Sequence, residues 1–321
     1  MMVFVDVLLA VALVLILLFG ALAWFTSRTV QRVQKALPPT GDLIDLNGTP
    51  LHVYQSGHGH SVLLIHGLAG QMGNFTYGLV ELLAPQFHVV VVDRPGSGYS
   101  PRAQTAAADV ETQAALLAQL IEQLELGPTL VVGHSLGGAI ALALALNHPQ
   151  VVAGLALVAP LTQLPDSTPA AFKSLEITSP LLRKFLASTV VVPVMIAGRN
   201  KILAQVFGPE PVPLDFDTRG GGLLSSRPSH FLAAASDMQA LPEAMPALQA
   251  RYRGLHLPVG VLFGRQDQVL NPTTNGQGLV DQVPGASLQL IDGGHMLPVT
   301  CPELTAQFII DMAQRSFVEQ G

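Results

Sequence analysis

The sequence predicts an α/β protein with a mostly parallel sheet flanked by helices. Short apolar runs alternate along the chain with longer segments whose apolar residues recur at helical spacing. Several short runs are nearly continuous Val, Leu and Ile, which is typical of strands buried on both faces of a parallel sheet. We therefore predict strands at residues 61–65, 88–92, 130–132, 154–158, 259–263 and 287–291.

Two helical segments have the position expected of crossover connections between parallel strands. Residues 106–124 carry apolar side chains at helical spacing and end before Gly127-Pro128. Residues 136–146 are rich in Ala and Leu and stop before His148-Pro149. A final helix is predicted from about residue 302 to residue 312.

The alternation is interrupted at residues 161–257, which contain apolar pieces and turn-rich pieces but no regular strand–helix rhythm. A structureless loop of this length is not expected inside a compact domain. We predict that residues 161–257 form an inserted helical cap, or lid. The core of the domain then comprises residues 42–160 and 258–321.

The chain begins with a strongly apolar segment. Residues 7–25 contain no charged side chain, and a helix needs roughly 20 apolar residues to cross a bilayer. We predict a transmembrane anchor at residues 1–27, followed by a linker at residues 28–41 that includes Pro38-Pro39.

A secretory signal peptide is the alternative, and Ala21-Leu22-Ala23 supplies a cleavage-site pattern. Against it, the uncharged run is long and only Asp6, rather than a basic residue, precedes it. Basic residues follow the run, which favours a cytoplasmic catalytic domain. Signal cleavage would instead give a secreted or periplasmic protein. The basic residues concerned are Arg28, Arg32 and Lys35.

Composition excludes several classes of protein. Sixteen Lys and Arg against 22 Asp and Glu give a net charge of −6, without the basic face that nucleic-acid binding needs. A single cysteine, Cys301, excludes a disulfide framework and a thiolate metal cluster. We expect Cys301 to be a packing residue.

The strongest functional signal is Gly133-His134-Ser135-Leu136-Gly137, which lies between a predicted strand and a predicted helix. This is the pattern of a nucleophile elbow, a strained turn that exposes a serine hydroxyl above the sheet. Gly133 and Gly137 supply the space that so tight a turn requires. Ser135 is therefore the candidate nucleophile.

A serine nucleophile needs a base, and the base needs a carboxylate that orients it. His295 lies just past the strand at residues 287–291, and Asp267 lies just past the strand at residues 259–263. Both loops reach the carboxyl edge of the sheet, where ligands bind in parallel sheets. Asp292 is a rival acid that we expect to cap its loop, and we assign Asp93 a structural role.

Acyl transfer also needs donors for an oxyanion. The segment His66-Gly67-Leu68 follows a predicted strand, so the backbone N–H of Leu68 can pair with that of Leu136 behind the nucleophile. His66 is interpreted as a hydrogen-bonded scaffold residue, because the sequence shows no metal-ligand spacing around it.

These motifs, together with Asp93-Arg94-Pro95-Gly96-Ser97-Gly98, resemble those of the α/β-hydrolase superfamily in their order along the chain. The resemblance covers about residues 51–312. It implies an eight-stranded, mostly parallel sheet with a helical cap inserted after the sixth strand, a triad of Ser135, His295 and Asp267, and no cofactor. A Ser nucleophile is unlike the Asp of epoxide hydrolases and dehalogenases.

The predicted function is hydrolysis of carboxylic esters with a hydrophobic acyl group through an acyl-enzyme. The expected partners are a small-molecule ester, with lipid-like esters among the candidates, and a membrane contacted by the N-terminal helix; nucleic acid is not expected. Thioester hydrolysis and carbon–carbon bond hydrolysis on the same fold remain alternatives. Carbon–carbon cleavage of a dicarboxylate would need basic groups, for which Arg183, Lys184 and Arg227 are the candidates. A non-catalytic binding scaffold is the third hypothesis.

Overall fold

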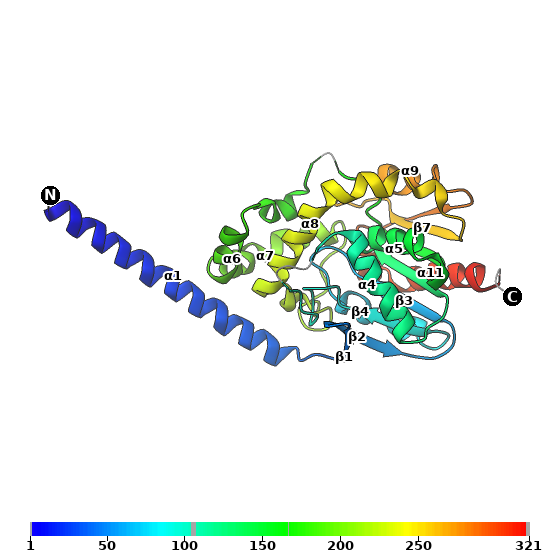
Figure 1. Ribbon diagram of the computed structural model, residues 1–321, viewed down its shortest axis with the longest axis horizontal. Helices are drawn as coiled ribbons and strands as arrows, with labels where there is room; N and C mark the ends of the chain where they lie inside the picture. Colours follow the sequence, from blue (N-terminus) through cyan, green and yellow to red (C-terminus); the bar gives the residue numbers. More distant parts are fainter. Residues whose placement is uncertain (1, 104–106, 166, 319–321) are drawn as a thin grey trace.

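The computed structural model describes residues 2–103, 107–165 and 167–318, with no side chain for Met2. Ala106, where the sequence predicts that a helix starts, lies outside these ranges. Residues 1, 166 and 319–321, which belong to the predicted anchor, cap and core, also lie outside them. A long helix, α1 (Met2–Ala36), extends from the body of the molecule (Figure 1). Because α1 continues to Ala36, most of the predicted linker is helical and only residues 37–41 are irregular.

The centre of the fold is a sheet of eight strands in the order β1-β2-β4-β3-β5-β6-β7-β8. Strand β2 pairs antiparallel with β1 and β4, and the remaining neighbours are parallel. This confirms the predicted fold class. The strands are β1 (Asp42–Leu46), β2 (Thr49–Ser56), β3 (Ser61–Ile65), β4 (His88–Val92), β5 (Thr129–His134), β6 (Val152–Val158), β7 (Val259–Gly264) and β8 (Ser287–Ile291).

All six predicted strands are present, and β3, β4 and β8 have the predicted bounds. The additional strands, β1 and β2, form the antiparallel end of the sheet. They lack the continuous apolar run that marks a strand buried on both faces, since β1 is largely exposed and β2 contains Pro50.

Helices cover both faces of the sheet. On one face, Leu63 and Ile65 of β3 pack with helices α4 (Val110–Gln123), α5 (Leu136–Asn147) and α8 (Pro228–Gln249). On the other face, Val62 and Leu64 pack with α2 (Gly73–Thr76), α3 (Leu79–Leu83), α10 (Leu297–Thr300) and α11 (Pro302–Val318). The alternation of side chains along β3 thus divides the core into two layers.

The predicted crossover helices are α4 and α5. Helix α4 begins at Val110 rather than near residue 106, because the Asp109 carboxylate caps it by accepting a hydrogen bond from the Thr112 N–H at 2.8 Å. Helix α5 is buried from Leu136 to Ala145, which explains why its sequence has no polar face.

The segment between β6 and β7 is helical, and α8 crosses it from the α1 side toward the core (Figure 1). The helical elements between β6 and β7 are η2 (Ala170–Glu176), α6 (Pro180–Ser188), α7 (Val191–Phe207), η3 (Gly222–Ser226), α8 and η4 (Tyr252–Gly254). The short elements elsewhere are η1 (Pro149–Val151), η5 (Pro272–Gln277) and α9 (Gly278–Val280).

Candidate active site

Ser135 occupies the turn between β5 and α5. Its backbone has φ 54° and ψ −122°, a conformation that non-glycine residues rarely adopt and that costs of order 1–3 kcal/mol. The Ser135 N–H donates to the Val158 carbonyl at 3.1 Å, which ties the turn to β6. A side chain held in this strained turn at the start of a helix matches the geometry predicted from the motif.

The flanking glycines are required by close backbone contacts. A Cβ on Gly137 would lie 2.1 Å from the Ile65 carbonyl oxygen, and one on Gly133 would lie 2.4 Å from the Gly137 carbonyl oxygen. Neither contact is sterically possible. Any larger residue at these positions would therefore displace the turn that carries Ser135.

Asp267 and His295 are brought together by the loops that follow β7 and β8. Oδ2 of Asp267 lies 2.7 Å from Nδ1 of His295, and both side chains are almost fully buried. Oδ1 of Asp267 accepts hydrogen bonds from the N–H groups of Val269 and Leu270 at 2.7 and 2.9 Å. A carboxylate with both oxygens accepting holds the proton of His295 on Nδ1 and leaves Nε2 free to accept one.

Ser135 and His295 line the same cavity. Within the described ranges the Ser135 hydroxyl forms no hydrogen bond to His295. In hydrolases without substrate this contact is often long and shortens when substrate binds. The arrangement thus places a hydroxyl and an imidazole around one space, with the carboxylate behind the imidazole.

The rival carboxylates lie in different surroundings. The Asp292 side chain is 89% exposed and lies 3.7 Å from Arg265, so it does not contact His295. Asp93 is buried, and its side chain accepts hydrogen bonds from the N–H groups of Met72 and Tyr99 and contacts His52 at 2.7 Å. Asp93 therefore has the structural role predicted for it.

The loop after β3 lies directly against Ser135. A Cβ on Gly67 would lie 2.7 Å from Cβ of Ser135, so the next residue, Leu68, reaches the same space. Among the described residues, no hydrogen-bond acceptor pairs with the backbone N–H of Leu68 or Leu136. Both groups are thus free to donate.

His66 supports this loop. Its Nε2 accepts the Arg94 N–H at 3.0 Å, and its Nδ1 therefore carries the proton and donates to the Gly67 carbonyl at 2.9 Å. Complete burial and the Arg94 charge hold the pKa of His66 well below its ordinary value. His66 is a neutral scaffold residue, as the sequence predicts.

Arg94 is a supporting residue that the sequence did not single out. Its guanidinium is buried and donates to the carbonyls of His66 and Gly67. Its charge is balanced by Asp237 of α8, which lies 2.7 Å away and also contacts Arg102 at 2.6 Å. The loop after β3 is thus braced by an ion pair that reaches into the inserted segment.

The loop that carries His295 has supports of its own. The His134 ring donates from Nε2 to the His295 carbonyl at 3.0 Å. The N–H groups of Gly293 and Gly294 donate to Gln266 at 2.7 Å and to Glu210 at 3.0 Å. Burial lowers the pKa of His134 to about 3, so this ring is neutral.

Two apolar cavities meet at Ser135 and share Leu68 and Phe172. One has a volume of about 150 Å³ and includes His295, Met296 and apolar side chains of α7 in its wall. The other has a volume of about 200 Å³ and lacks His295. Its further apolar wall is formed by Leu136, Leu161, Leu164, Met238, Leu241 and Leu270.

Comparison with known proteins agrees with the geometry. Residues 60–300 match the family described as the alpha/beta hydrolase fold. The chain belongs to this family. This α/β hydrolase is an enzyme of the hydrolase class, and the eight-stranded sheet with its flanking helices is the fold of the family.

Its relatives carry several activities in their names. It is 27% identical over 267 residues to a predicted carbamate hydrolase, RutD, of Pantoea ananatis, covering 81% of this chain and 90% of that protein. It is 25% identical over 269 residues to the monoacylglycerol lipase ABHD6 of Bos taurus, covering 79% and 75%. Among solved structures, a membrane phospholipase A aligns with a TM-score of 0.65 and 23% identity, covering 97% of each chain.

Proposed function

We propose that this hydrolase cleaves carboxylic esters, with Ser135 as nucleophile, His295 as general base and Asp267 as the carboxylate that orients His295. The observation that carries the proposal is the 2.7 Å contact between Asp267 and Nδ1 of His295, in the wall of the cavity that also contains Ser135. A free Nε2 facing the same space as a serine hydroxyl is what acyl transfer requires.

In the proposed reaction the Ser135 oxygen attacks the ester carbonyl while Nε2 of His295 accepts the hydroxyl proton. Collapse of the tetrahedral intermediate breaks the bond to the leaving alkoxide, which takes the proton back from His295 and departs as the alcohol. Water then attacks the acyl-enzyme, again giving a proton to His295. Its oxygen joins the acyl carbon, the bond to Ser135 breaks, and Ser135 regains its proton as the acid leaves.

The negative charge of each intermediate needs donors. We assign this role to the backbone N–H groups of Leu68 and Leu136, which have no other acceptor within the described chain. Loss of one such donor costs about 3 kcal/mol in known hydrolases. His66, Gly67 and Arg94 act by holding the Leu68 loop against Ser135.

The two apolar cavities favour a hydrophobic acyl group. The leaving alcohol receives its proton from His295, so it must lie in the cavity that contains His295. The acyl group then enters the cavity of about 200 Å³, which is formed mainly by apolar side chains. Burial of each CH₂ group there contributes about 0.8 kcal/mol.

Carbon–carbon cleavage of a dicarboxylate has less support. Among the described residues, no Arg or Lys lines either cavity. Of the candidate basic groups, Arg227 donates to the Gly98 carbonyl and lies over the Tyr99 ring. The sequence expectation that Arg183, Lys184 and Arg227 could bind such a substrate finds no structural basis at the site.

We also propose that α1 anchors the enzyme in a membrane, with the catalytic domain on the cytoplasmic side. Residues 3–36 are long and apolar enough to cross a bilayer, and a signal sequence passes the same test. The basic residues that follow the uncharged run support the cytoplasmic orientation. Cleavage after Ala23 would instead leave a secreted or periplasmic enzyme.

A substrate panel tests the proposed function. Purified full-length enzyme in detergent is assayed on nitrophenyl esters of increasing acyl length, on the matched thioesters and on a vinylogous diketone. We expect hydrolysis of oxygen esters with a rate that rises from acetate to medium-length chains. A steady preference for acetate would contradict the hydrophobic acyl group, and faster cleavage of the thioesters or the diketone would replace the ester assignment.

A further inference from the structure

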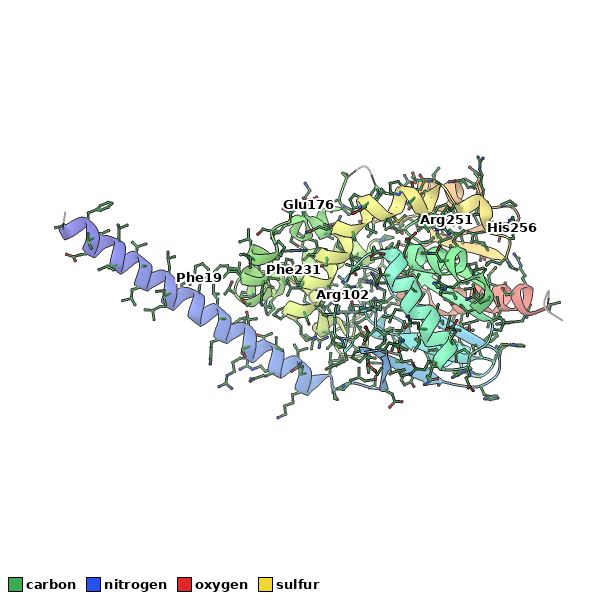
Figure 2. The ribbon with its side chains drawn as sticks, viewed as in Figure 1. Phe19, Arg102, Glu176, Phe231, Arg251 and His256 are labelled. Atoms are coloured by element: carbon green, nitrogen blue, oxygen red, sulfur yellow. The ribbon has the colours of Figure 1, made fainter. Side chains whose placement is uncertain are left out.

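Helix α1 does not stand apart from the catalytic domain but packs against the inserted segment. The Phe19 ring meets the Phe185 ring of α6 edge-on with centroids 4.9 Å apart, and Figure 2 shows Phe19 between α1 and the green cap helices. Seven residues further along α1, the Thr26 hydroxyl donates to the Thr189 carbonyl at 3.4 Å. After a further seven residues, Val33 is also buried. The side of α1 that carries these three residues therefore packs against the inserted segment, whose elements α6, α7 and η3 all contact α1.

The position of this contact along α1 fixes the depth of α6. Phe19 precedes Phe25, the last residue of the uncharged run, by six residues. At 1.5 Å per residue this separation is about 9 Å along the helix axis. If α1 crosses a bilayer with residues 7–25 in its hydrocarbon core, Phe185, which contacts Phe19, lies in the outer part of that core. Helices that lie in a membrane interface are buried to about 5–10 Å, the same depth.

The helices at this depth expose an apolar surface. Leu181 is 83% exposed and Val194 is 60% exposed, and large apolar side chains exposed together on neighbouring helices mark a surface for interaction. We call this surface the α6–α7 patch; it consists of Leu181, Leu182, Phe185 and Val194. Helices α6 and α7 meet at an angle of 78°.

The charges around the patch suit a lipid headgroup layer. Residues 177–209 contain no Asp or Glu. Lys184 and Lys201 are exposed, while Arg199 pairs with Asp217. An apolar face with lysines beside it, on a segment that has no acidic residue of its own, is the composition of interfacial helices that bind anionic lipid surfaces.

From the contact, the depth, the exposed surface and the charges, we propose that the α6–α7 patch inserts into the same bilayer leaflet that α1 enters. This inference rests on the proposed anchor. The other side of α7 supplies Met195, Leu203 and Val206 to the cavity of about 150 Å³ beside His295. Helix α7 thus lies between the lipid and the cavity beside His295.

Depth-dependent fluorescence quenching tests the insertion. The full chain carries Cys301→Ser and a single new cysteine, labelled with an environment-sensitive fluorophore, in vesicles of phosphatidylcholine and phosphatidylglycerol. Leu181→Cys and Val194→Cys report on the patch. Leu18→Cys, 49% exposed on α1, reports on the anchor. Leu304→Cys, 51% exposed on α11, is the matched control because α11 lies at the end of the molecule away from α6 (Figure 1). Retained hydrolysis of a water-soluble ester shows that each variant is folded.

We expect lipids with a nitroxide near the headgroup to remove roughly half or more of the emission at positions 181 and 194, and little at position 304. Quenching at position 18 without quenching at positions 181 and 194 overturns the inference and leaves the anchor standing. Absence of quenching at all four positions overturns the inference and the anchor together. Quenching at 304 equal to that at 181 also contradicts it, because the label would then report contact with lipid at any surface.

Discussion

Oδ2 of Asp267 accepts a hydrogen bond from Nδ1 of His295 across 2.7 Å, and neither side chain is more than 4% exposed. The two residues are 28 positions apart in the chain and follow neighbouring parallel strands, β7 and β8. Because this contact fixes which ring nitrogen of His295 can accept a proton, the remaining chemistry of the site depends on it.

Asp267→Asn should therefore reduce kcat by about 10⁴-fold while the protein stays folded, because an amide can hold His295 in the wrong tautomer. Asp292→Asn is the matched control, since that carboxylate is 89% exposed and three residues from His295 in sequence. Steady-state kinetics on one ester measures both variants. Equal losses in the two variants, or a loss of less than tenfold in Asp267→Asn, would refute the assigned role.

Asp237→Asn should destabilise the protein by about 3–5 kcal/mol, because it leaves the buried guanidinium of Arg94 without its counter-charge. Asp292→Asn, which removes the exposed pair with Arg265, should cost less than about 1 kcal/mol. Denaturant unfolding in detergent compares the two. Similar costs would show that the Arg94 pair does not brace the structure as described.

Stability should fall on acidification through two buried histidines. Burial lowers the pKa of His134 and of His230 to about 3, whereas an unfolded histidine titrates near 6.5. Between these values the unfolded chain binds protons that the folded chain does not. The contribution of the two neutral histidines to the free energy of unfolding is therefore complete above about pH 6.5. It is lost as the pH falls toward 3, by up to about 1.4 kcal/mol per pH unit for each histidine.

Unfolding free energies measured between pH 7 and pH 4 check this slope. His230→Asn should reduce it, with Asn supplying a polar group in place of the ring that accepts the Gly98 N–H. His256→Asn is the control, since His256 is exposed on the loop before β7. An unchanged slope in His230→Asn would argue against burial as the cause.

The two cavities should respond separately to filling. Leu241→Trp in the cavity without His295 should reduce activity on long acyl chains, with each excluded CH₂ costing about 0.8 kcal/mol, or about fourfold in rate, and should affect acetate esters least. Leu203→Trp in the cavity with His295 should instead discriminate among acetate esters of alcohols of different length. The reverse pattern would exchange the assignments of acyl group and alcohol.

Much of the fold could be predicted from the sequence because buried parallel strands carry an unbroken apolar run. β3 and β4 have the predicted bounds for that reason. β1 and β2 lie at the antiparallel end of the sheet, where exposure and Pro50 remove that signal. Residues 28–36 were predicted as part of a linker that includes Pro38-Pro39, yet α1 continues to Ala36, because the charged residues that follow a membrane span do not end a helix.

The candidate site divides in a similar way. Ser135, Asp267 and His295 could be found because each follows a predicted strand at one edge of the sheet. Arg94 and Glu210 could not, because their roles arise from tertiary contacts: Arg94 reaches two carbonyls of the loop after β3, and Glu210 reaches Gly294 from the inserted segment. Partners this distant in sequence leave no local pattern.

The central claim is that Ser135 is the nucleophile, and covalent labelling tests it most directly. Full-length enzyme is treated with a fluorophosphonate, digested and examined by mass spectrometry, beside Ser135→Ala, which should fold normally and lose at least about 10³-fold in turnover. We predict one adduct, on the peptide that contains Ser135, and none in the variant. An adduct on another residue, or a Ser135→Ala variant that hydrolyses esters at the original rate, would contradict the account.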